Sequence, residues 1–244
     1  MKRGTILALL FFISLLFLLP LGLSFKSENV NEGLVSYYSF DKNADDSIGR
    51  YNGSVYGAVL VKGIKNQAYY FNGSDNFIYF GDILDDELKD GFTIGLWIKL
   101  DKGALQKPHN YIFWKSDDSP GMRVSEDKVI FTYFYQGNES GRISTRSVEE
   151  QKWYYLTYSF DGSNFVGYIN GKREFSFVNT TAYTPGGDVK IGSDEKDPSY
   201  GRHFKGIIDE VKIWNFALSD SGVKQEYNNR KTIWKVINWF KKFF

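Results

Sequence analysis

The central part of the chain alternates short apolar stretches with polar turns. The clearest case is Lys152–Val178, where three stretches rich in β-branched and aromatic residues are joined by Asp161-Gly162 and by Asn170-Gly171. These dipeptides tolerate the positive φ angles of tight hairpins, so the pattern predicts three consecutive antiparallel strands. The same signals predict further strands at Leu34–Phe40, Val55–Val61, Ala68–Phe71, Phe77–Phe80, Phe92–Leu100, Tyr111–Trp114, Val129–Tyr135, Val189–Ile191 and Lys205–Trp214. Helical periodicity is nearly absent between them, which predicts an all-β antiparallel sandwich or jelly roll.

Alternation within single strands predicts which side faces the core. In 92–100 the apolar side chains at every second position share one face, so we expect that face to be core and the other to be partly wet. In 129–135 the residues Phe131, Tyr133 and Tyr135 share one side. We interpret this tyrosine side as a candidate solvent-exposed face.

The N-terminal residues 1–24 combine a basic start with an almost unbroken apolar run from Ile6 to Leu23. This pattern is typical of an export signal. Pro20 and the small residues beside Leu23 favour a cleaved signal peptide. The alternative is an uncleaved membrane anchor, because about 18 apolar residues is the lower limit for spanning a bilayer. Both interpretations predict an extracellular or cell-surface protein.

The C-terminal residues 229–244 predict a short amphipathic helix with a cationic side. Its apolar positions at helical spacing are Ile233, Val236, Ile237, Phe240 and Phe244. Flanking tryptophans and five positive charges suit the headgroup region of an anionic membrane, which is one interpretation. The other is a helix that packs on the body as a structural cap.

Composition narrows the chemistry. The 244 residues include no cysteine, which excludes disulfides, thiolate metal sites and thiol nucleophiles. The chain has 30 Lys and Arg against 29 Asp and Glu, and seven of the basic residues lie before residue 25 or after residue 228. Residues 25–228 therefore hold 23 basic and 29 acidic groups, a formal charge of −6. This acidic balance predicts that the body does not bind nucleic acid.

A catalytic site is not evident from the acidic residues or histidines. Glycoside hydrolysis needs two carboxyl groups in one cleft, which on a strand means acids two or four positions apart. Only Asp85 with Glu87 and Glu195 with Asp197 have the two-residue spacing, and both pairs lie in polar stretches typical of loops. The two histidines lack metal-motif spacing. We therefore predict that the protein is not an enzyme.

A series of segments resembles a known family. In order along the chain these are GLVSYYSFD (33–41), DSIG (46–49), AYYFNGSDNFIYF (68–80), FTIGLWIKL (92–100), WYYLTYSFDGSNFVGYINGK (153–172), VKIG (189–192) and FKGIIDEVKIWNFALS (204–219). They resemble the laminin-G-like, concanavalin A-type jelly rolls over nearly all of 33–228. The resemblance implies two curved antiparallel sheets, a carbohydrate-binding or adhesive role and, in some members, a structural calcium ion. The fold is also similar to that of laminarinase-type glycoside hydrolases, whose Glu-x-Asp-x-Glu signature this sequence lacks.

Oxygen-bearing side chains follow the first predicted strand at 41–46 and suit a hard cation such as calcium. The resemblance implies that such an ion joins this region to the aspartate of the last long strand, which is Asp209 here. Asp209 lies in an apolar run, where an unpaired carboxylate is costly, so we expect either a cation or a hydrogen-bonding partner there. The candidate calcium ligands are therefore Asp41, Asp46 and Asp209. The alternative for 41–46 is a polar turn without an ion.

Sugar recognition usually needs an aromatic platform and a few polar groups that fix the hydroxyls. The candidates on or beside the middle strands are Trp114, Tyr133, Tyr135, Arg123 and Arg142. The competing interpretation is that the aromatic residues pack in the core and the arginines lie in solvent.

Three functions remain open from the sequence. The first is a secreted or cell-surface module that binds glycans without catalysis. The second is a structural or protein-adhesion sandwich whose partners are extracellular proteins. The third is a divergent polysaccharide hydrolase or lyase.

Overall fold

The computed structural model describes residues 29–115, 120–135, 138–178, 186–194 and 201–229. The predicted signal or anchor at 1–24 and the predicted cationic helix beyond Asn229 lie outside these residues. No helix among the described residues is both long and apolar enough to cross a membrane.

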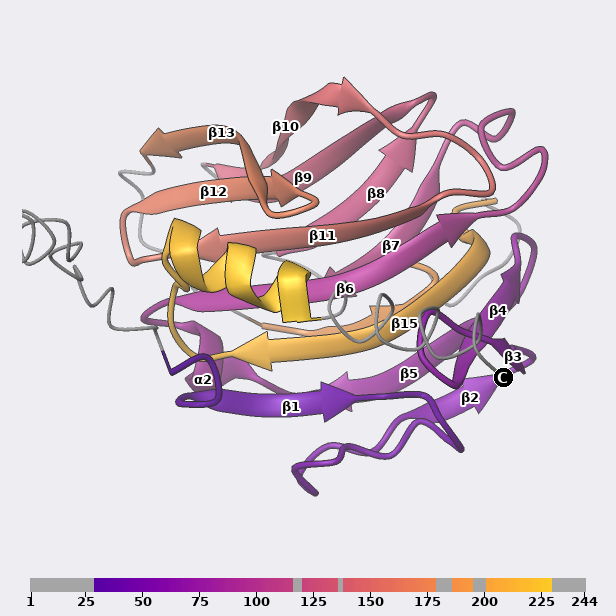
Figure 1. The fold of residues 1–244 in the computed structure, drawn as a ribbon, viewed down its shortest axis with the longest axis horizontal. Helices are drawn as coiled ribbons and strands as arrows, with labels where there is room; N and C mark the ends of the chain where they lie inside the picture. Colours follow the sequence, from indigo (N-terminus) through magenta and orange to yellow (C-terminus); the bar gives the residue numbers. More distant parts are fainter. Residues whose placement is uncertain (1–28, 116–119, 136–137, 179–185, 195–200, 230–244) are drawn as a thin grey trace, which may run out of the picture.

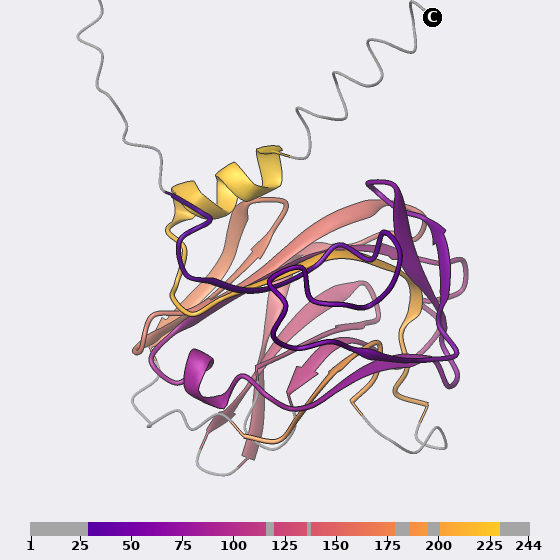
Figure 2. The ribbon, with the colours of Figure 1, turned by 90° about the horizontal axis from the view of Figure 1, so that it is seen from below.

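Two antiparallel sheets pack face to face, as the sequence predicts (Figures 1 and 2). The eight-stranded sheet runs in the order β13 (Lys172–Val178), β12 (Asn164–Ile169), β11 (Trp153–Phe160), β6 (Phe92–Leu100), β15 (Lys205–Trp214), β4 (Gln67–Asn72) and β3 (Val59–Lys62), with β1 (Leu34–Tyr38) beside β15. The seven-stranded sheet runs in the order β10 (Asn138–Ser147), β9 (Lys128–Tyr135), β8 (Gly121–Ser125), β7 (Asn110–Lys115), β14 (Asp188–Ile191), β5 (Phe77–Asp82) and β2 (Ser54–Tyr56). This confirms the all-β jelly-roll sandwich.

Turn chemistry explains much of the strand layout. Asn170 and Gly171 both have positive φ, of 53° and 70°, at the turn that joins β12 to β13. The single strand expected at Val55–Val61 is instead two short strands in different sheets. Gly57, with a φ of 69°, lies between them and lets the chain cross from one sheet to the other. The sequence analysis also missed β8 and the polar edge strand β10.

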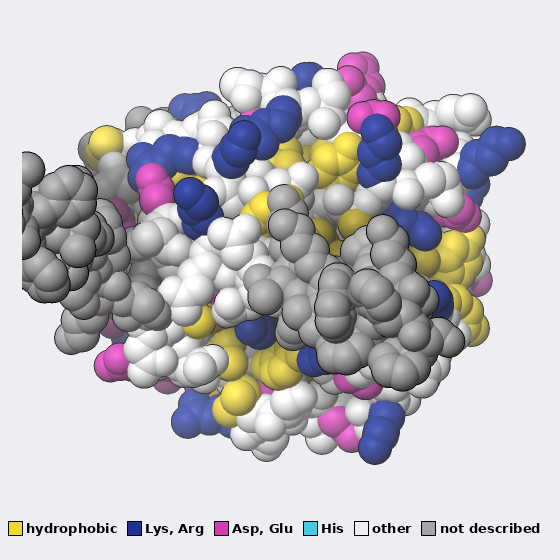
Figure 3. All heavy atoms as spheres, viewed as in Figure 1, with side chains coloured by type: hydrophobic (Ala, Val, Ile, Leu, Met, Phe, Trp, Pro, Cys, Tyr) yellow, Lys and Arg dark blue, Asp and Glu magenta, His cyan; other side chains and the backbone are white. Residues whose placement is uncertain are grey.

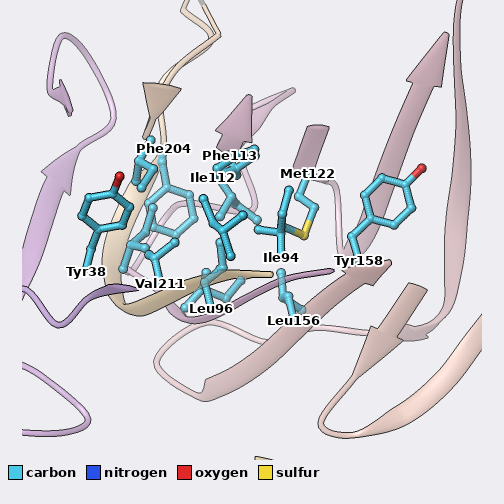
Figure 4. Close-up of a cluster of buried hydrophobic side chains, with 14 of the residues drawn as sticks. Tyr38, Ile94, Leu96, Ile112, Phe113, Met122, Leu156, Tyr158, Phe204 and Val211 are labelled. Carbon is cyan, nitrogen blue, oxygen red and sulfur yellow. The ribbon is translucent and has the colours of Figure 1, made fainter. Parts of the chain in front are cut away.

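The core lies between the two sheets (Figure 4). Alternate residues of β6, including Phe92, Ile94 and Leu96, are fully buried in it, as the alternation predicts. The tyrosine side of β9 was predicted to be exposed, and this is wrong at Phe131, which is fully buried in the core. The side chains of Tyr133 and Tyr135 lie outside the described set.

The other face of β6 was expected to be partly wet, and this holds only at its end, where Lys99 is partly exposed. Trp97 is buried on this face because a helix at residues 220–229 covers the eight-stranded sheet (Figures 1 and 2). Thr93 is buried under the segment that leads to this helix, and its hydroxyl bonds to the main chain of Phe216 and Leu218. The Ser219 hydroxyl accepts the main-chain N–H of Gly222 at the start of this helix, which is the usual capping contact. Tyr227 stacks on Trp97 with ring centroids 5.7 Å apart.

This face of the molecule carries no single charged patch on its visible described surface. Lys and Arg side chains are dispersed among uncharged and acidic ones (Figure 3).

Candidate functional site

The outer face of the seven-stranded sheet, which points away from the core, carries a row of aligned residues. The strand register places side by side Ser54, Tyr79, Lys190, Trp114, Gly121 and Thr132. Their neighbours along the strands point inward and belong to the core, among them Ile78, Ile191, Phe113, Met122 and Phe131. Two aromatic groups lie on this outer face, one near its centre and one at its edge.

The central group surrounds Tyr111 of β7. The guanidinium of Arg123 lies 5.4 Å from the centre of the Tyr111 ring and donates a hydrogen bond of 3.2 Å to its hydroxyl. The guanidinium of Arg202 lies 6.0 Å from the same ring. Trp114 and His109 contact the ring edge-on, at 5.2 and 6.1 Å between centroids. Hydrogen bonding and cation–π attraction thus bring two guanidinium groups to one ring, and Arg202 also forms an ion pair of 3.1 Å with Asp194.

Trp114 and Arg123, two of the predicted sugar-binding residues, are therefore brought together, and Tyr111 is the contact that the sequence analysis missed. A bulge in β7 explains the omission. Because of it, Ile112 and Phe113 both point into the core, so Tyr111 and Trp114 share the outer face although they are three positions apart. A regular strand would place them on opposite faces.

Trp114 does not offer an open ring face, since its side chain is only 7% exposed. The indole lies over Gly121, where an added Cβ would be 2.4 Å from the ring and 2.3 Å from Oγ1 of Thr132. A sugar cannot stack on this buried indole in the present conformation. Trp114 instead supports Tyr111 from the side.

The edge group is formed by Tyr56 of β2 and Phe77 of β5. Their rings stack with centroids 4.6 Å apart and an interplanar angle of 9°. Tyr56 is 49% exposed. Of the large hydrophobic side chains that are exposed in the described part of the chain, it is the one with an aromatic ring. The ring of Phe77 lies 6.5 Å from that of His203. In the sequence, the one signal for Tyr56 is its position immediately before the turn glycine Gly57.

The remaining predicted sugar-binding residues are not assembled with these groups. Arg142 of β10 lies opposite Phe131, on the core-facing side of the sheet, and its guanidinium is 4.6 Å from the centre of the Phe177 ring in β13. It therefore closes the edge between the two sheets. The side chains of Tyr133 and Tyr135 belong to the part of the chain that is not described.

Asp46, a candidate calcium ligand, is surrounded by main-chain N–H donors. Its Oδ1 accepts hydrogen bonds of 2.9 Å from the amides of both Tyr37 and Ile48. Its Oδ2 accepts bonds of 3.3 Å from the amides of both Arg50 and Tyr51. These four N–H groups stabilise the negative charge of Asp46, a role that the sequence analysis assigned to a calcium ion.

The other two candidates hold a different turn, the one between β3 and β4. Oδ2 of the fully buried Asp209 accepts the amides of Ile64 and Lys65, at 2.8 and 3.3 Å. Asp41 accepts the amide of Gln67 and the side-chain amide of Asn66. Within the described ranges no three His, Cys, Asp or Glu residues form a group that could hold a metal ion. A structural calcium ion held by Asp41, Asp46 and Asp209 therefore stays a prediction.

Two carboxyl groups do share a cavity, on the outer side of the eight-stranded sheet. The cavity has a volume of about 220 Å³, and its lining includes Asp161 and Asp220. Burial raises the pKa of Asp161, but the amides of Asn164 and Ser163 outweigh it and lower the pKa below its ordinary value. Burial likewise raises the pKa of Asp220, and the hydrogen bonds of Tyr168 and Arg173 lower it. Neither carboxyl has the raised pKa that a glycosidase acid needs.

Comparisons with known proteins agree with this architecture. A family model described as the concanavalin A-like lectin/glucanases superfamily matches residues 72–224. A shell matrix protein of Mytilus californianus is 29% identical over 134 residues, which are 52% of this chain and 43% of that protein. The non-toxic nonhemagglutinin type A of Clostridium botulinum is 26% identical over 106 residues, 42% of this chain and 9% of its own length. The chain thus spans less than half of the curated relatives it matches.

Solved structures show the same fold at low sequence identity. Domain 4 of AbnA, an extracellular GH43 arabinanase from Geobacillus stearothermophilus in complex with arabinotriose, has a TM-score of 0.60 and 23% identity, covering 79% of this chain and 97% of that domain. The binding domain of botulinum neurotoxin serotype D has a TM-score of 0.67 and 15% identity, covering 83% and 53%. With the family match extending over more than half of the residues, the chain belongs to the concanavalin A-like lectin/glucanase superfamily.

Proposed function

We propose that the sandwich is an extracellular, non-catalytic module that binds glycans on the outer face of the seven-stranded sheet. The observation that carries this proposal is the half-exposed Tyr56 ring stacked on Phe77. Sugar rings bind through their apolar faces to flat aromatic rings. The Phe77 ring holds Tyr56 in place before a ligand arrives, which lowers the entropy cost of binding.

The rest of the face suits a ligand longer than one sugar. From β2 to β8 the face crosses four strand intervals, a distance of about 19 Å. Arg123 and Arg202 lie beside Tyr111 toward the far end of this distance and carry donors suited to hydroxyl or carboxylate oxygens. An oligosaccharide that stacks on Tyr56 can extend across β5 and β14 toward these donors.

The comparisons support this function without assigning a ligand. The arabinanase domain was solved with arabinotriose. That parent enzyme is extracellular, and the relatives include a shell matrix protein, which supports a location outside the cell. A protein partner is the second candidate, because a botulinum neurotoxin binding domain of this fold was solved with rat synaptotagmin II.

The test is glycan-array binding followed by calorimetric titration with the best oligosaccharide. We expect Tyr56→Ala to weaken binding by about tenfold or more, equivalent to about 1.4 kcal/mol, and Tyr56→Phe to keep most of the affinity. Val178→Ala is the matched control, since Val178 is exposed on β13 of the other sheet. Glycan binding that Tyr56→Ala leaves unchanged contradicts the proposed face. Silence across the array together with protein capture supports adhesion, and release of reducing ends from a polysaccharide supports an enzyme.

A further inference from the structure

The end of β7 contains a lysine that has no contact with solvent. The side chain of Lys115 is 0% exposed. It lies opposite Val189 in the sheet register, on the side that faces the core. A lysine is almost never fully buried unless its charge is satisfied. We therefore expect the groups around its ammonium to satisfy the charge.

Four oxygen atoms surround this ammonium group. Lys115 Nζ donates hydrogen bonds of 2.8 Å to the carbonyl oxygens of Ile83 and Gly187. Its distances to Oδ1 of Asp85 and Asp82 are 2.5 and 3.8 Å. The two carbonyls accept two of the three N–H donors of the ammonium, and the carboxylates of Asp85 and Asp82 add two negative charges beside it. We call these four groups the oxygen cage.

The cage joins parts of the chain that are distant in sequence. Ile83 precedes Leu84, which has a left-handed φ of 72° and begins the short helix α2 (Asp85–Leu88). Gly187, with a φ of 79°, precedes β14. Leu84 and Leu88 are buried in the core, so the turn around Ile83 has to be held in place for them to pack. The ammonium group links this turn to the start of β14.

The donor set is the one that hard cations prefer. Main-chain carbonyls and carboxylates are the ligands of calcium in proteins. Asp82 and Asp85 are each about half exposed or more, so water can complete a larger coordination shell. From this arrangement we infer that the Lys115 ammonium occupies the place of a small hard cation, and that the oxygen cage binds calcium once the Lys115 side chain is removed.

The experiment is a thermal melt of Lys115→Ala with and without millimolar calcium, paired with calorimetric titration of the same variant. Truncation leaves two carboxylates and two buried carbonyls without their cation, and we expect Tm to fall by about 10 °C. Calcium should recover a substantial part of this loss in a saturable manner, with one site per chain. The native chain, in which the ammonium fills the cage, should show no such shift.

Two matched variants separate the cage from general effects of calcium. Lys152→Ala removes a lysine whose ion pair with Glu149 is exposed, and its Tm should not respond to calcium. Lys115→Ala combined with Asp85→Asn should lose the calcium response. If Lys115→Ala does not fold without calcium, the refolding yield is measured across the same calcium titration. No calcium-dependent gain in Tm or yield, or an equal gain in either matched variant, overturns the inference.

Discussion

Replacing Asp46 by alanine removes the acceptor of four main-chain N–H groups at once. The carboxylate is almost fully buried, and it connects the first strand to the loop at 46–51. If Asp46 is a structural acceptor, the loss comes from unpaired amides, and no metal ion takes part. If it is a calcium ligand, the same substitution acts through the ion. The two cases predict different responses to a chelator.

The magnitude follows from the four contacts. A buried donor left without a partner costs about 1–3 kcal/mol, and less where water can replace the lost acceptor. The amides of Ile48 and Arg50 belong to exposed residues, so water can reach them, whereas the Tyr37 amide lies in β1. We therefore expect Asp46→Ala to lower the free energy of unfolding by about 3 kcal/mol. For a domain of this size that corresponds to a fall in Tm of about 6–12 °C.

The assay is urea and thermal unfolding, followed by tryptophan fluorescence, for the native chain and for Asp46→Ala. The control is Asp45→Ala, because Asp45 is exposed and its carboxylate contacts the side chain of Asn43. We expect the control to stay within about 0.5 kcal/mol of the native chain. We also expect a chelator to leave the native Tm unchanged. A native Tm that falls in chelator and recovers with calcium, or an Asp46→Ala variant of native stability, refutes the reasoning.

Two further predictions concern the opposite sheets. Gly121→Ala should displace the Trp114 indole, shift the tryptophan emission and destabilise the chain by about 1–3 kcal/mol. Gly186→Ala, where an added Cβ meets no atom within 4 Å, is the matched control, and equal effects in both variants would contradict the steric argument. Because the pKa of Asp220 is lowered in the folded state, its ionised form stabilises the fold above about pH 4 and loses this contribution as pH falls. Asp220→Asn should therefore lower the free energy of unfolding at pH 7 by less than about 1 kcal/mol, since the side chain is largely exposed. In urea titrations at several pH values, the variant should also lose less stability on acidification than the native chain. If the unfolding free energy of Asp220→Asn depends on pH below pH 4 as that of the native chain does, the prediction is wrong.

Local patterns were reliable where the backbone itself sets the geometry. The Asn170-Gly171 turn and the buried face of β6 at Ile94 were both predictable, because a tight turn and a two-residue period depend on neighbouring positions only. The crossing of the chain between sheets at Gly57 was not predictable, because two short strands in different sheets have the same sequence pattern as one continuous strand.

The candidate site was predictable only in part. Trp114 and Arg123, which the sequence analysis selected, share the outer face of the seven-stranded sheet, but the bulge that brings Tyr111 beside Trp114 leaves no mark in the alternation of residues. Tyr56 is held flat against the ring of Phe77, which lies 21 positions later in the chain. Aromatic residues can pack in the core or lie on the surface with the same sequence pattern.

The sequence by itself determined most of the strands, the tight turn at Asn170-Gly171, the core-facing side of β6 and the absence of thiol chemistry, because these depend on composition and on short-range backbone geometry. Only the tertiary structure decided which charges are satisfied and by what. Asp209 is held by amides about 145 positions earlier in the chain, and Lys115 by carbonyls of two other segments. A buried charge can be satisfied by any oppositely polarised group that the fold brings within hydrogen-bond distance, and no local pattern specifies which group that is.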